Sequence, residues 1–81
     1  MEHLRLKGDT VMTVFFIKGN EKRQIGISNN IQECYKIIYN FLEERNYDSP
    51  YTRISKYEDH LWIDVGSYTE FFEIWGEDIT I

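Results

Sequence analysis

The sequence has one cysteine and one proline, and its longest apolar run is short. With Cys34 alone, the chain cannot close an internal disulfide, and a reducing compartment is the default expectation. The apolar run 11–17 falls well below the roughly 20 residues that a transmembrane helix needs. No stretch resembles a signal peptide. These absences predict a cytoplasmic location and no membrane partner.

Motifs for common chemistries are also missing. The sequence contains no glycine-rich phosphate loop, nucleophile elbow or paired zinc motif, so we expect no enzyme and no cofactor. The one cluster of potential metal ligands is Glu58, Asp59, His60 and Asp64. The spacing from His60 to Asp64 exceeds the reach of one ion unless another strand contributes, and a solvated turn explains the cluster better. Cys34 lacks an activating neighbour and is expected to be a packing residue.

Basic residues are scarce in the C-terminal third. The net charge is −5, and residues 51–81 carry two basic and seven acidic side chains, whereas residues 1–50 are balanced. Such a field repels phosphate backbones and would steer the protein toward a basic partner. Solubility alone explains the same acidity. An acidic surface that imitates nucleic acid is a third, less specific interpretation.

Aromatic residues are abundant for so small a chain: five Phe, six Tyr and two Trp in 81 residues. They supply large buried areas where a short chain has few core residues. We expect a single α+β domain over residues 12–81. Residues 1–11 are interpreted as a non-native or mobile extension, because 6–12 could be encoded by a ribosome-binding site upstream of a start at Met12.

One segment, from Asn30 to Arg45, has clear helical periodicity. Asn30 is a favoured N-cap and Glu33 completes a capping-box pattern, while Asn46 can adopt the left-handed conformation that ends a helix. The apolar positions that share one side are Ile31, Cys34, Tyr35, Ile38, Phe41 and Leu42. A helix this apolar requires a covering sheet.

Alternating and β-branched patterns predict the strands of that sheet. The second face of 11–17 is also apolar, which favours an interior position, and 51–57 has few aliphatic residues, which favours an edge. Gly26 suggests a bulge or a close approach by another element. The expected strands are 11–17, 23–28, 51–57, 60–65 and 69–75, with a short segment at 79–81 that pairs at an edge or frays.

The predicted fold is therefore a two-layer α+β domain, with an antiparallel sheet of about five strands packed on one helix in the order β-β-α-β-β-β. The sheet residues expected beneath the helix are Val14 or Phe15, Ile25, Ile27, Ile54, Leu61, Ile63, Val65, Phe72 and Ile74.

The opposite sheet face is then aromatic with interspersed charge, which is typical of protein interfaces. Packing of rings across neighbouring strands on a solvated face explains the pattern equally well. Arg53 and His60 fall on this face with the candidate binding residues, which are Tyr51, Tyr57, Trp62, Asp64, Phe71, Glu73 and Trp75.

These observations predict a small non-catalytic protein-binding module of the inhibitor or adaptor type, of the kind that phages and mobile elements encode. The expected partner is another protein with a basic surface, or a second copy in a homodimer. A single-stranded nucleic-acid-binding module that stacks bases on the same rings is the alternative, although the acidic excess opposes it.

Overall fold

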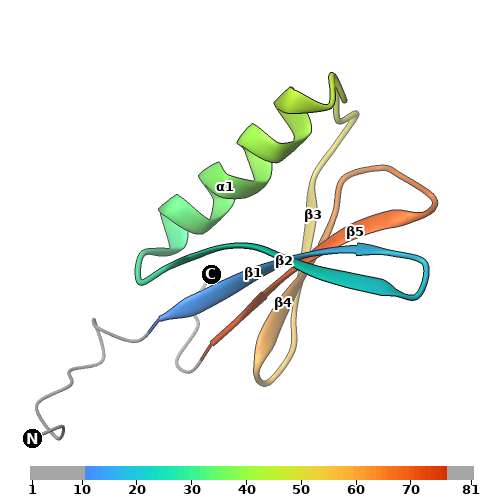
Figure 1. The fold of residues 1–81 in the computed structure, drawn as a ribbon. Coiled ribbons are helices and arrows are strands. Elements are labelled where there is room, and N and C mark those ends of the chain that lie inside the picture. The colour runs from blue at the N-terminus through green and yellow to red at the C-terminus, as the bar shows by residue number, and fades with distance from the viewer. Residues whose placement is uncertain (1–10, 77–81) are drawn as a thin grey trace, which may run out of the picture.

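In the computed structural model, which describes residues 11–76, an antiparallel sheet packs on one helix (Figure 1). The predicted two-layer α+β fold is confirmed. The order β2-β1-β5-β4-β3 places β1 inside the sheet and β3 at an edge, as expected. The extension 1–11, apart from Val11, and the segment 79–81 lie outside the described residues. The elements are β1 (Met12–Lys18), β2 (Glu21–Ser28), α1 (Ile31–Glu44), β3 (Arg53–Lys56), β4 (His60–Asp64) and β5 (Glu70–Trp75).

The ends of α1 lie where the sequence predicts them. The Asn30 side-chain oxygen accepts hydrogen bonds from the backbone N–H groups of Gln32 and Glu33, at 2.8 and 3.2 Å. The Asn30 N–H donates to the Ser28 hydroxyl, so Ser28 takes the place that the capping box assigns to the Glu33 side chain. At the other end, Asn46 has φ 57° and closes the helix. Within residues 11–76, α1 does not combine the length and the apolar character that crossing a membrane requires.

A β-bulge in β2 changes which residues face the helix. Val14 pairs with Gly26 but Phe15 pairs with Gln24, so Ile25 is the extra residue. Ile27 therefore pairs with Thr13 on the far face and is 56% exposed. The prediction that Ile27 lies beneath α1 is wrong for this reason.

Gly26 faces the helix instead, and both of its predicted roles are confirmed, because it lies beside the bulge and at a close approach. A Cβ atom at this position would lie 2.8 Å from Cδ1 of Ile37. Only glycine lets α1 approach the sheet this closely.

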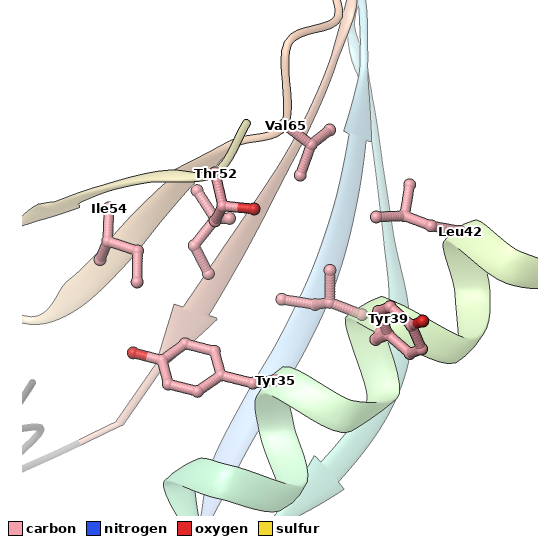
Figure 2. A pocket seen from close by; sticks show the side chains of 8 residues that line it. Tyr35, Tyr39, Leu42, Thr52, Ile54 and Val65 are labelled. Carbon is pink, nitrogen blue, oxygen red and sulfur yellow. The ribbon is translucent and has the colours of Figure 1, made fainter. Parts of the chain in front are cut away.

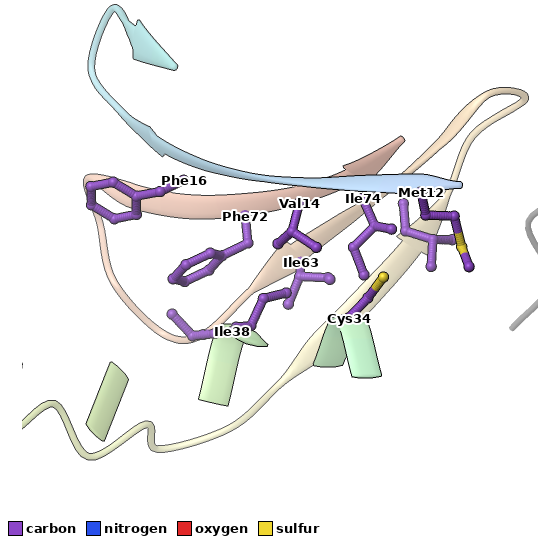
Figure 3. Packing of buried hydrophobic residues seen from close by; sticks show 10 residues of the cluster. Met12, Val14, Phe16, Cys34, Ile38, Ile63, Phe72 and Ile74 are labelled. Carbon is purple, nitrogen blue, oxygen red and sulfur yellow. The ribbon is translucent and has the colours of Figure 1, made fainter. Parts of the chain in front are cut away.

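The core lies between α1 and the sheet (Figure 3). Val14, not Phe15, points toward α1, and Cys34 and Ile38 point from α1 toward the sheet. Desolvation raises the pKa of the Cys34 thiol, which suits a packing residue. The other buried residues are Met12, Phe16, Leu61, Ile63, Val65, Phe72 and Ile74.

Candidate functional site: the open face of the sheet

The sheet face that points away from α1, here called the open face, is covered by no other element of residues 11–76 (Figure 1). Strand register arranges its side chains in three rows that cross the strands. The first row is Ile27, Thr13, Trp75, His60 and Tyr57; the middle row is Gln24, Phe15, Glu73, Trp62 and Ser55; the third row is Lys22, Ile17, Phe71, Asp64 and Arg53.

Three rings of the first row form a continuous stack. The His60 ring lies 4.2 Å from Trp75 at an interplanar angle of 9°, and 5.0 Å from Tyr57 at 17°. These distances match the roughly 4.8 Å spacing of neighbouring strands. The rings therefore stand upright on the sheet, with their faces toward each other and their edges toward solvent.

A second stack crosses the middle of the open face. Trp62 and Phe71 have ring centroids 4.7 Å apart at 29°. The Lys22 ammonium lies 4.6 Å from the Trp75 ring and 4.8 Å from the Phe15 ring, within cation–π range. Much of the π surface on this face is thus already used by intramolecular contacts.

Charges on the open face are balanced and mostly engaged. One oxygen of Glu73 accepts the Trp75 indole N–H at 2.6 Å and lies 3.2 Å from the Lys22 nitrogen. An oxygen of Asp64 accepts the Gly66 N–H at 2.9 Å. With Arg53, this face has two cations and two anions among the described residues. The acidity of the C-terminal third does not extend to this face, and the expected basic partner gains no support from it.

In the Glu58–His60 turn, the side chains of His60 and Asp59 are in polar contact. Nδ1 of His60 lies 2.9 Å from an oxygen of Asp59, and the hydrogen bond from His60 lowers the pKa of the exposed Asp59 carboxyl below its ordinary value. Within residues 11–76, no three His, Cys, Asp or Glu side chains lie close enough together to hold a metal ion.

Six of the seven predicted site residues lie together on the open face. Five of them are placed there by register and Tyr57 by its stack with His60. Tyr51 lies apart, before the start of β3, where the Arg53 guanidinium is 5.4 Å from its ring. Glu73 and Trp75 are brought into direct contact, as are Trp62 and Phe71.

The sequence reasoning missed the contribution of β1 and β2 to this face. Phe15 and Ile17 lie in the rows beside Glu73 and Phe71, and the alternation of β1 was the signal for them. Ile27 and Lys22 had no comparable signal, because the bulge shifts the alternation of β2.

A groove, which the sequence did not predict, lies between α1 and the strands β3 and β4 (Figure 2). Its volume is about 270 Å³. It exists because α1 packs over β1 and β2, and a helix about 10 Å wide leaves part of a five-strand sheet uncovered. The lining residues are Tyr35, Ile38, Tyr39, Leu42, Thr52, Ile54, Ile63 and Val65.

The groove is apolar with one polar exception. The Tyr35 hydroxyl oxygen is buried and has no hydrogen-bond partner in the described part of the chain, and it points toward the β3 side (Figure 2). Burial also raises the pKa of this hydroxyl. An apolar group carrying one hydrogen-bonding atom would suit this groove chemically.

Comparison with models of protein families, with curated proteins and with solved structures gives no match.

Proposed function

We propose that the protein is a small, non-catalytic binding module of the inhibitor or adaptor type, and that its open face docks on another protein surface. The observation that carries this proposal is the pair of upright ring stacks on an uncovered sheet face, Tyr57–His60–Trp75 and Trp62–Phe71.

Preorganisation makes these rings effective as contact groups. The side chains of Trp62, Phe71 and Trp75 are only partly exposed, because each packs against its neighbours across the strands. Their rotamers are therefore restricted before any partner arrives, so docking loses little side-chain entropy. The Glu73 carboxylate accepts the Trp75 N–H and pairs with the Lys22 ammonium, so covering these groups leaves no unpaired charge.

The alternative, a platform for single-stranded nucleic acid, has less support from the geometry. Base stacking needs ring faces that are open to solvent, whereas the two stacks present ring edges. Lys22 and Arg53 are the open-face cations within residues 11–76, and Glu73 and Asp64 offset their charge. Phosphate backbones require a larger excess of positive charge.

Photo-cross-linking from a single position tests the proposal. Tyr57 is 52% exposed at the rim of the open face, and Tyr68, on the β4–β5 loop, is 99% exposed. Benzoylphenylalanine replaces one tyrosine at a time, and the protein is irradiated in its native cells. We expect discrete protein adducts from position 57 and none, or only diffuse ones, from position 68.

The two positions serve as matched controls, because both replace an exposed tyrosine by an aromatic photoreactive residue. Equal adduct patterns from both positions, or no adduct from position 57, would contradict docking through the open face. Adducts to nucleic acid from position 57 would instead support the alternative function.

A further inference from the structure

We infer that the groove between α1 and the strands β3 and β4 binds a small, neutral, unbranched aliphatic molecule that carries one carbonyl-type hydrogen-bond acceptor. The groove lies on the helix side of the sheet, so this site is separate from the open face and does not depend on the proposed function. Its lining, its dimensions and one buried hydroxyl group together define the ligand (Figure 2).

The lining of the groove opposes a charged ligand. Ile38 and Leu42 contribute apolar groups from α1, and Ile54, Ile63 and Val65 contribute them from the sheet side. Among the described residues, no side chain that lines the groove is charged. A carboxylate, phosphate or ammonium group would therefore lose its hydration here without gaining an opposite charge. The ligand that fits this lining is neutral and mostly apolar.

The dimensions of the groove set the size and the shape of the ligand. An apolar cavity of about 150 Å³ accommodates benzene, so a volume of about 270 Å³ accommodates roughly ten non-hydrogen atoms. Tyr35 and Leu42, the first and last α1 residues of the lining, are about two helical turns or about 10 Å apart along the helix axis. A space of this volume that extends along a helix suits an unbranched chain better than a fused ring.

The Tyr35 hydroxyl group supplies a specific polar contact. Its oxygen is buried and has no hydrogen-bond partner in the part of the chain that the structure describes. Burial raises the pKa of this hydroxyl, so it stays protonated and can donate a hydrogen bond at neutral pH. Buried polar groups without a partner are uncommon in native proteins, and each one calls for an explanation. A neutral ligand with one acceptor oxygen would give this donor its missing partner.

The hydroxyl group has to turn to meet a ligand, because it points toward the β3 side (Figure 2). Within residues 11–76 no hydrogen bond holds it there, and the Tyr35 side chain as a whole is only partly buried. Rotation about its side-chain bonds therefore breaks no polar contact, and the groove beside it leaves room for the ring. We expect the acceptor end of the ligand at Tyr35 and its chain directed toward Leu42.

Two probes of the same shape test the hydrogen bond. Methyl hexyl ketone can accept one, whereas the alkene in which a methylene group replaces the ketone oxygen cannot. Titration of the protein with each probe, followed by NMR of the side-chain methyl groups, gives the dissociation constant and the location. We expect the ketone to bind with a dissociation constant on the order of 1 mM, as suits so small a ligand. Methyl signals of Ile63 and Val65 should shift, and those of Ile27 on the open face should not.

Tyr35→Phe removes the donor and should raise the dissociation constant of the ketone about tenfold, while that of the alkene stays within about twofold. Tyr39→Phe is the matched control, because it removes a hydroxyl group from another lining tyrosine of α1, whose side chain is 61% exposed. It should leave both dissociation constants within about twofold of wild type. Without ligand, Tyr35→Phe should keep or raise the melting temperature, since the hydroxyl has no partner to lose.

Octanoate tests the exclusion of charge, because it joins a similar chain to a carboxylate. It should bind at least about tenfold more weakly than the ketone. The inference would be overturned if saturating ketone left the Ile63 and Val65 methyl signals unchanged, or if octanoate bound as tightly as the ketone. An equal loss of ketone and alkene binding in Tyr35→Phe, or a lower melting temperature of that variant, would show that the hydroxyl supports the fold and would reject its contact with the ligand.

Discussion

The two faces of the sheet are built from the same strands, yet they reach partial or full burial in different ways. Beneath α1, aliphatic and phenyl groups such as Leu61 and Phe72 lose all contact with solvent. On the open face, Trp62 and Phe71 shield each other without a covering layer. Phe71 and Phe72 are adjacent in the chain, yet Phe71 lies on the open face and Phe72 is buried beneath α1. Burial by a second layer stabilises the fold, whereas self-packing of rings leaves a surface that another molecule can cover.

Truncating the two adjacent phenylalanines should show the largest difference between the two faces. Phe72→Ala should lower the free energy of unfolding by about 4 kcal/mol, because it leaves a cavity in a fully covered site. Phe71→Ala should lower it by only about 1 kcal/mol, because solvent already reaches its ring. Urea denaturation measures both. Equal losses would show that the open face is a second core.

A smaller effect is expected from adding one methyl group beneath the helix. Gly26→Ala should lower the free energy of unfolding by about 2 kcal/mol, since its Cβ would lie 2.8 Å from Cδ1 of Ile37. Ile27→Ala, one residue later on the open face, should change it by less than about 1 kcal/mol. Combining Gly26→Ala with Ile37→Ala should recover part of the loss. Additive losses in the double variant would contradict the steric explanation.

A still smaller effect on stability is expected from neutralising the Glu73 carboxylate on the open face. Glu73→Gln keeps the shape of the side chain but removes its charge from the Lys22 ammonium, 3.2 Å away. We expect a loss of about 1 kcal/mol in unfolding free energy, together with a change in Trp75 fluorescence. In a Lys22→Met background, Glu73→Gln should cause no further loss of unfolding free energy. If Glu73→Gln costs as much in that background as in the wild type, the ion pair does not stabilise the open face.

The smallest expected effect concerns pH at the edge of the first-row stack. The pKa of Asp59 is lowered in the folded state by the hydrogen bond from His60. Its contribution to stability is therefore present above the ordinary value of 3.8 and is lost as the pH falls through the lowered value. Asp59→Asn should flatten the acid side of the melting-temperature profile slightly. A profile that steepens instead would contradict the assigned direction.

The sequence predicted the helix and most strands because their signals lie within short segments of the chain. The Asn30 cap, the Asn46 stop and the alternation of Leu61, Ile63 and Val65 depend on residues close in sequence. The aromatic open face followed from the same alternation in β4 and β5. Ile27 was misplaced because a one-residue bulge reverses the sidedness of a strand and leaves little trace in composition.

The period-two and period-3.6 patterns of the sequence are enough to predict that one helix covers one side of an antiparallel sheet and that aromatic side chains occupy the other. The folded molecule adds that β5 lies between β1 and β4, that the rings stack upright in rows, and that a groove remains beside α1. The alternation within a single strand fixes which face of the sheet each side chain joins. Strand order, ring orientation and the extent of helix cover depend on contacts between residues far apart in the chain.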